Sequence, residues 1–144
     1  MIKIYRILFA LHFFVGFGAL VGGFATIINP EEPLGMSVKY LQYSPFKNYL
    51  IPGILLFIVI GLGNVVSAII VRMKFRFQAY ISSIFSWALM IWIVVQCIML
   101  NSVVFIHVFY FIIGLIEAVL SIIILFHQRL FPTNIVIRLL KRKV

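Results

Sequence analysis

Acidic side chains, and charged side chains in general, are scarce in this chain. Three of its 144 residues are Asp or Glu, and charged residues make up 10% of the sequence. Soluble domains typically contain about 25% charged residues, because their surfaces face water. Hydrophobic residues account for 65% of the chain, and its mean hydropathy is +1.22. The composition therefore excludes an ordinary soluble domain and indicates a membrane as the surrounding medium.

Cysteine is nearly absent as well, since Cys97 is the only one. A single cysteine excludes an internal disulfide bond and a C-x-x-C redox pair, which disfavours a thiol–disulfide oxidoreductase. His12, His107 and His127 fall at different depths of the predicted helices, and no spacing typical of a metal site occurs. Nucleophile motifs, glycine-rich phosphate loops and paired carboxylates are also missing. We therefore expect no metal and no cofactor, and the sequence disfavours an enzyme.

Long apolar runs are what the chain does contain. They cover about 7–28, 49–71, 77–100 and 105–126, and each exceeds the roughly 20 residues that a membrane-spanning helix needs. Unbroken runs of this kind exclude the alternating pattern of a membrane β-barrel. We predict a single all-α domain over 1–144, an integral membrane four-helix bundle. A cleaved signal peptide is the alternative for the first run, but the length of the run favours a retained helix.

The connections between the runs are short and rich in turn-forming residues. Residues 29–33 end the first run, and residues 34–43 have an apolar side that predicts a short helix at the outer membrane surface. The turn at Asn101 and Ser102 is so short that the third and fourth runs must form an antiparallel hairpin. In residues 132–144 the basic and the apolar residues fall on different faces of a helix. This pattern predicts a basic amphipathic tail on the cytoplasmic membrane surface.

The basic residues predict how the bundle lies in the membrane. The formal net charge is +9, and most of the cations fall on the side of the two termini. That side carries Lys3, Arg6, Arg72, Lys74, Arg76, Arg129, Arg138, Lys141, Arg142 and Lys143, and the other side carries Lys39 and Lys47. Positively charged segments stay in the cytoplasm, so we predict cytoplasmic termini. An anionic lipid surface explains this charge better than nucleic acid does, because no aromatic and basic residues interleave as in a nucleic-acid platform.

Glu117 is the only acid outside the 29–33 loop, and it falls in the middle of the last apolar run. At helical spacing it shares a face with Gly114, Ala118 and Ser121. An ionisable group at that depth is costly unless another group satisfies it, and such residues commonly mark functional sites. We therefore take Glu117 as the centre of the candidate site.

Three other polar residues fall in the same layer as Glu117 when depth is counted at about 1.5 Å of helical rise per residue. They are His12, Asn64 and Ser86. The imidazole of His12 can exchange a proton with the carboxyl group, and Asn64 and Ser86 can satisfy the remaining lone pairs. Small residues on the same helical faces support the layer: Gly16, Gly61, Gly114 and Ser121. The sequence thus predicts a ligand-binding or proton-binding site.

Each of these residues also has a purely structural interpretation. Asn and Ser between membrane helices often act as hydrogen-bonding glue worth about 0.6–2 kcal/mol, and His12 by itself is typical of a satisfied interior histidine. Gly18 and Gly22 form a small-x-x-x-small pair that predicts a close helix crossing. Hydration at the membrane interface explains a second, shallower group of polar residues: Gln96, Asn101 and His107.

Three stretches carry a resemblance to known proteins. They are 44–53 with the sequence SPFKNYLIPG, 61–63 with GLG, and 92–96 with WIVVQ. Over roughly 34–117 the chain resembles small bacterial four-span membrane proteins that have no assigned activity, which implies the four-span topology and a bacterial inner or plasma membrane. Small multidrug transporters also contain a single membrane glutamate, but theirs lies in the first helix, whereas Glu117 lies in the fourth.

These features leave three functions open. The first is a non-enzymatic bundle that binds membrane lipid or an apolar molecule, or that docks on a larger membrane complex or forms a homodimer. The second is a proton-coupled small-molecule carrier that uses Glu117 with His12. The third is a membrane enzyme that acts on lipid, with the same two residues as an acid–base pair. The absence of catalytic motifs favours the first.

Overall fold

The computed structural model describes residues 1–141, and four helices in this part of the chain are long and apolar enough to cross a membrane. No β-strand occurs among these residues. In chain order the spans are α1 (Ile2–Ile28), then α2 (Leu50–Leu55), η3 (Leu56–Leu62) and α3 (Gly63–Arg72), which together form the second span, then α4 (Gln78–Met99) and α5 (Phe105–Gln128). The predicted all-α class is therefore confirmed, and so is the presence of four helices that are long and apolar enough to span a membrane.

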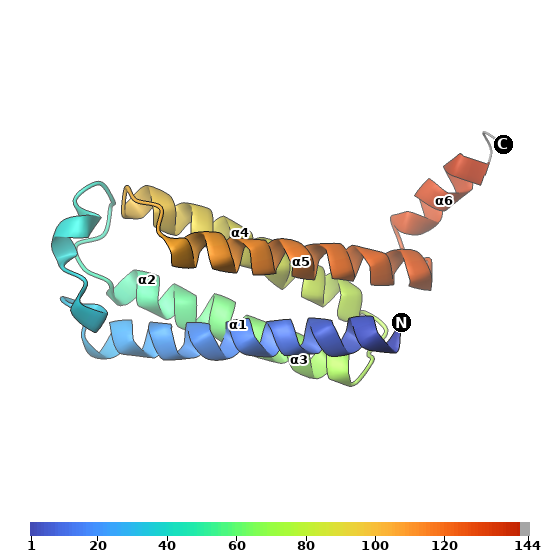
Figure 1. The fold of residues 1–144 in the computed structure, drawn as a ribbon, viewed down its shortest axis with the longest axis horizontal. Helices are drawn as coiled ribbons and strands as arrows, with labels where there is room; N and C mark the ends of the chain where they lie inside the picture. Colours follow the sequence, from blue (N-terminus) through green and yellow to red (C-terminus); the bar gives the residue numbers. More distant parts are fainter. Residues whose placement is uncertain (142–144) are drawn as a thin grey trace.

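Two helical hairpins make up the bundle (Figure 1). One consists of α1 packed along the whole second span, and the other consists of α4 packed against α5. The hairpins join through contacts between α3 and α4 and between α1 and α5. The N-terminus lies at the same end of the bundle as the helix that follows α5, and residues 29–49 lie at the opposite end. We call these the terminal end and the loop end.

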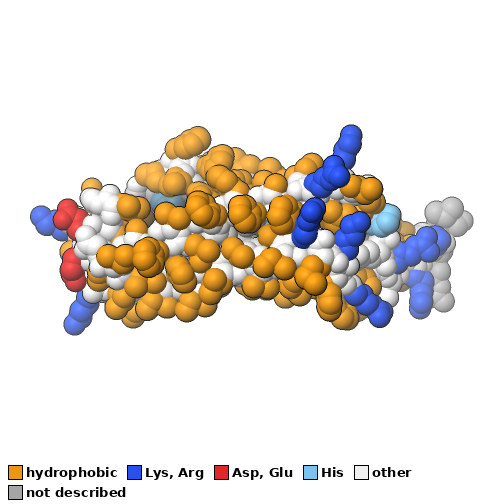
Figure 2. All heavy atoms as spheres, turned by 90° about the horizontal axis from the view of Figure 1, so that it is seen from below, with side chains coloured by type: hydrophobic (Ala, Val, Ile, Leu, Met, Phe, Trp, Pro, Cys, Tyr) orange, Lys and Arg blue, Asp and Glu red, His pale blue; other side chains and the backbone are white. Residues whose placement is uncertain are grey.

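Apolar side chains cover the middle of the bundle, and Lys and Arg gather toward the terminal end (Figure 2). The face of α5 that points away from the core carries exposed apolar residues such as Phe105, which is 83% exposed, and Ile112, which is 49% exposed. An apolar belt with charge confined to the ends suits a bilayer. Cytoplasmic placement of the termini stays a prediction.

A short helix, α6 (Thr133–Lys141), follows α5 and forms the described part of the predicted tail. Arg138 and Lys141 fall in its last turn, and Leu139 and Leu140 are more than half exposed. Exposed leucines beside cations suit a lipid surface, and that contact also stays a prediction. The last three residues of the predicted tail, 142–144, lie outside the described residues.

The loop end is built differently from the single short helix predicted over 34–43. Two short 3₁₀ turns occur there, η1 (Pro33–Gly35) and η2 (Val38–Leu41). Gly35 has a φ of +81° and Leu34 a φ of +52°, so the backbone enters the left-handed region and a continuous helix cannot form. The Ser37 hydroxyl then caps η2 by accepting a hydrogen bond from the Lys39 backbone N–H.

The closest approach in the first hairpin lies at Gly16 and Gly23 of α1. A Cβ atom on Gly16 would lie 2.9 Å from the backbone nitrogen of Val65, and one on Gly23 would lie 2.7 Å from that of Phe57. Only a residue without a side chain permits such contact between two backbones. These two glycines therefore set the distance between α1 and the second span.

The pair predicted to make this crossing, Gly18 and Gly22, is the wrong pair. Gly18 faces the Tyr110 hydroxyl group, and a Cβ atom on Gly22 would meet only a side-chain carbon of Leu56, at an ordinary 3.5 Å. The face of α1 that packs inward recurs at seven-residue spacing, as in left-handed helix pairs. Its buried members are Leu8, His12, Val15, Gly16, Ala19, Gly23 and Thr26.

The second span contains a π-helical stretch, η3, between two α-helical parts. Pro52 lies in the first turn of α2, where its missing N–H has no helical partner to lose. A π-helical turn holds more residues than an α-helical turn, and such turns frequently occur at functional sites. The wider turn changes the direction in which later residues point, and the first polar residue that follows it is Asn64.

Candidate functional site

The centre of the bundle holds a layer of polar side chains contributed by all four spans. His12 comes from α1, Asn64 from the second span, Ser82 from α4, and Glu117 and Ser121 from α5; none of these residues is exposed. Two apolar clusters enclose this polar layer. Toward the loop end lie Val15, Ala19, Ile60, Leu89, Ile93 and Ile113, and toward the terminal end lie Leu8, Val71, Ala79, Ile124 and Leu125. The polar groups must therefore satisfy one another.

Asn64 determines where one proton of His12 lies. Its side-chain nitrogen Nδ2 donates a hydrogen bond to the Ile60 carbonyl oxygen at 2.8 Å, which turns Oδ1 toward His12 Nδ1 at 2.7 Å. Because an amide oxygen only accepts, Nδ1 must carry the proton in this contact. The tautomer of the imidazole follows from the orientation of the amide.

The other ring nitrogen of His12 faces a chain of two hydroxyl groups. Nε2 lies 2.5 Å from Ser82 Oγ, and Ser82 Oγ lies 2.7 Å from Ser121 Oγ. The Ser121 hydroxyl also lies 2.7 Å from the backbone carbonyl oxygen of Glu117, which is an alternative acceptor for its proton. Since each hydroxyl has one proton to donate, the direction of this chain depends on whether Nε2 carries a proton.

The carboxyl group of Glu117 lies beside the imidazole. Its Oε1 is 3.3 Å from His12 Nδ1, and both side chains are fully buried. Within the described residues, neither carboxyl oxygen has a hydrogen-bond partner. A buried ionisable group without hydrogen bonds is costly, so the interaction with His12 is the main compensation that Glu117 receives.

Some of the predicted site residues belong to the polar network, and one lies beside it. His12 lies within hydrogen-bond distance of Asn64 and within ion-pair distance of Glu117. Ser86 is buried close to the Glu117 carboxyl group, but it directs its own hydroxyl to the Ser82 carbonyl oxygen at 2.7 Å. It is therefore a neighbour of the network and not one of its links.

The supporting small residues also differ in what they contact. Gly16 and Gly61 lie in the interface between α1 and the second span, and Gly114 faces Met90 and Leu89 of α4. Ser121, expected only to provide a small face, is a member of the hydrogen-bonded chain.

Sequence reasoning missed the role of Ser82 in the network. A signal was present, because Ser82 lies one helical turn from Ser86 on the same face of α4. Depth counting selected Ser86 because it assumed that α4 starts level with its neighbours and runs parallel to them. His107 also differs from expectation: it is only 6% exposed, and its Nδ1 accepts a hydrogen bond from the Val104 backbone N–H.

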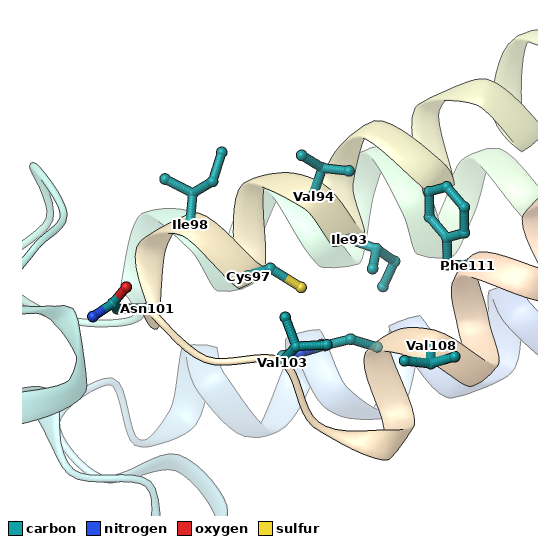
Figure 3. A pocket seen from close by; sticks show the side chains of 9 residues that line it. Ile93, Val94, Cys97, Ile98, Asn101, Val103, Val108 and Phe111 are labelled. Carbon is teal, nitrogen blue, oxygen red and sulfur yellow. The ribbon is translucent and has the colours of Figure 1, made fainter.

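Two cavities lie between the polar layer and the loop end. The first, which we call the hairpin cavity, has a volume of about 480 Å³ and lies between the ends of α4 and α5 (Figure 3). The Cys97 thiol points into the space bounded by Val103, Val108 and Phe111. The second, which we call the interhelical cavity, has a volume of about 360 Å³ and walls from all four spans.

Apolar residues form most of the wall of the interhelical cavity. Near the polar layer the wall includes Val15, Ile60 and Leu89, which are at most 2% exposed. Val15 and Ile60 lie one helical turn from His12 and Asn64 respectively, so one layer of apolar side chains separates the cavity from the polar network. The Ile60 carbonyl oxygen that fixes Asn64 belongs to that same layer.

No protein family model, curated protein or solved structure matches this chain. The resemblance of the 44–53 segment to small bacterial four-span proteins stays a prediction.

Proposed function

We propose that this protein is a non-enzymatic membrane protein that binds an acyl chain of a membrane lipid in the interhelical cavity. The observation that carries the proposal is an apolar cavity of about 360 Å³ with walls from all four spans. Pockets that bind small molecules have volumes of about 300–1,000 Å³, mostly apolar walls and a few polar groups. The surrounding bilayer supplies acyl chains at high concentration.

The ends of the cavity support this occupant. Leu34 and Ile106 belong to the wall and are more than half exposed, so the cavity reaches the outside of the bundle. Polar residues of the wall that include Thr26, Gln96 and His107 lie toward the loop end, where a lipid headgroup would lie. A chain that entered from this end would leave its polar group near the surface and extend toward Leu89.

Tryptophan fluorescence tests the occupant directly. Trp92 lies in the cavity wall, whereas Trp87 is 53% exposed on the outer face of the same helix. In a Trp87→Phe variant in liposomes, lipids with brominated acyl chains are expected to quench Trp92. Adding Gly22→Leu should reduce this quenching several-fold, because the new side chain fills the cavity and its Cβ atom clears Leu56 at 3.5 Å.

The matched control is Val21→Leu, which changes the neighbouring residue on the lipid-facing side, where Val21 is 54% exposed. It should leave the quenching of Trp92 unchanged. In a Trp92→Phe variant, the quenching of Trp87 should not respond to Gly22→Leu. Equal quenching of Trp92 with and without Gly22→Leu would show that no chain enters the cavity.

A proton-coupled carrier is the second candidate, and the buried contact between His12 and Glu117 favours it. Here Glu117→Gln is expected to abolish uptake of a fluorescent lipophilic cation driven by an imposed pH gradient in liposomes, while circular dichroism still shows a folded bundle. Glu32→Gln, on the exposed loop, is the matched control and should retain uptake. Uptake that survives Glu117→Gln, or that the unmodified protein never supports, argues against a carrier.

Three further proposals stand beside these two. They are lipid chemistry by His12 and Glu117, docking on a larger membrane complex, and formation of a homodimer. A membrane enzyme would turn over a lipid substrate and lose that activity in His12→Ala. The apolar-chain proposal requires no turnover, so the quenching experiment separates the two.

A further inference from the structure

We infer that the polar layer is a proton-binding site in which Asn64 holds one proton permanently on His12 Nδ1, so that a second proton is taken up at Nε2. The inference goes beyond acyl-chain binding and holds whether or not the bundle transports a solute. It rests on the hydrogen bonds of five buried residues. They are His12, Asn64, Ser82, Glu117 and Ser121.

The first step concerns Nδ1. The hydrogen bond from Asn64 Nδ2 to the Ile60 carbonyl oxygen leaves Oδ1 as the group that faces Nδ1. If Nδ1 lost its proton, two acceptors would face each other at 2.7 Å inside an apolar core, which is strongly unfavourable. When its carboxyl group is ionised, Glu117 Oε1, at 3.3 Å from the same nitrogen, adds a third acceptor. Nδ1 therefore stays protonated.

The second step concerns Nε2. When His12 is neutral, the Ser82 hydroxyl donates to Nε2, and Ser121 donates to Ser82. When a proton from water binds the lone pair of Nε2, a new N–H bond forms and donates to Ser82 Oγ. Ser82 then turns and donates to Ser121, and the Ser121 hydroxyl turns and donates to the Glu117 backbone carbonyl oxygen at 2.7 Å. Two hydroxyl rotations thus accommodate the added proton, and every donor keeps an acceptor.

The third step concerns the charge that this proton adds. The Glu117 carboxylate is the ionisable group that faces the imidazole, at 3.3 Å from Nδ1. The groups that face it from the second span and from α4 are Asn64, Ser82 and Ser86, none of which ionises. Tyr80 is two residues from Ser82, but its hydroxyl donates to the Phe131 carbonyl oxygen. The next ionisable residues along the other described helices are Arg6, which is exposed and six residues from His12, Tyr110, seven from Glu117, and Arg72, eight from Asn64. The charged imidazole and Glu117 therefore form an isolated pair.

Nitrogen NMR of ¹⁵N-histidine-labelled protein tests the inference. His107→Gln and His127→Gln in the same chain leave His12 as the only histidine, and the protein is studied in liposomes across a pH series. Neutral His12 is expected as the Nδ1–H tautomer, the minor form of free histidine, and the charged form should carry protons on both nitrogens. In Asn64→Leu the Nδ1–H share of the neutral ring should fall and the Nε2–H share should rise, because only Glu117 Oε1, at 3.3 Å, then faces Nδ1.

Two further variants separate this role from simple packing. Asn64→Gln keeps an amide and should retain part of the Nδ1–H signal, whereas Ser67→Ala, a buried neighbour whose hydroxyl donates only to the Gly63 carbonyl oxygen, should change nothing. In Glu117→Gln the doubly protonated form should be absent at pH values where the parent protein shows it. An Nε2–H tautomer in the parent protein, a tautomer that Asn64→Leu does not alter, or a His12 that never binds a second proton would each overturn the inference.

Discussion

Replacing His12 with leucine is expected to destabilise the bundle by about 3–5 kcal/mol, because it leaves several buried polar groups without a partner and each such group typically costs about 1–3 kcal/mol. The variant leaves the Glu117 carboxyl group fully buried, and within the described residues its oxygens have no hydrogen bonds to compensate for the loss. Ser82 and Asn64 also lose the groups that they contact through Nε2 and Nδ1. The free energy of unfolding, measured by circular dichroism in mixed micelles with increasing denaturing detergent, checks this expectation.

The stability of His12→Leu is best compared with that of the double variant His12→Leu with Glu117→Leu. Replacing both members of a buried pair by apolar residues is often neutral or stabilising. The double variant should therefore regain the part of the stability that the unpaired carboxyl group costs, while Asn64 and Ser82 still lack the imidazole. His127→Leu changes an exposed histidine on the same helix as Glu117 and should alter stability by less than about 0.5 kcal/mol. A His12→Leu variant that is as stable as His127→Leu would show that the carboxyl group does not depend on the imidazole.

The depth of the polar layer could be predicted because the rise of a helix is constant. Counting residues from the charged ends brings His12, Asn64 and Glu117 to one level, and the structure places them in contact. The displacement of each helix along its axis and its tilt are not contained in such a count. Ser82 therefore took the position expected for Ser86, which lies one turn away on the same face.

Other features depend on how the helices pack. Local sequence suggested Gly18 and Gly22 as the crossing pair, but the face that α1 turns to its partner depends on the partner as well, and it contains Gly16 and Gly23. The loop-end turns depend on a left-handed backbone conformation at Leu34. Leucine rarely adopts this conformation, so the residue type does not predict it. The interhelical cavity is the volume that packing leaves unfilled, so no residue pattern identifies it.

Gly23→Ala is expected to have the second largest effect, because the added methyl group would meet backbone and not a movable side chain. A Cβ atom at this position lies 2.7 Å from the backbone nitrogen of Phe57 and 2.8 Å from its Cα. No rotamer change can relieve that contact, so α1 and η3 must separate along their interface. Overpacking of this kind typically costs about 1–3 kcal/mol, and we expect the upper part of that range.

The adjacent substitution, Gly22→Ala, provides a control of identical chemistry. Its Cβ atom would meet only a Leu56 side-chain carbon at 3.5 Å, and the stability of the bundle should remain within about 0.5 kcal/mol of the parent protein. Separation of α1 from the second span should also lengthen the contact between His12 and Asn64, which cross the same interface. Gly23→Ala should therefore weaken the Nδ1–H tautomer of His12, and Gly22→Ala should not. Equal stability of the two variants would mean that the backbone of the second span shifts at η3 to accommodate the added methyl group. The glycines of α1 would then not determine the geometry of the polar layer.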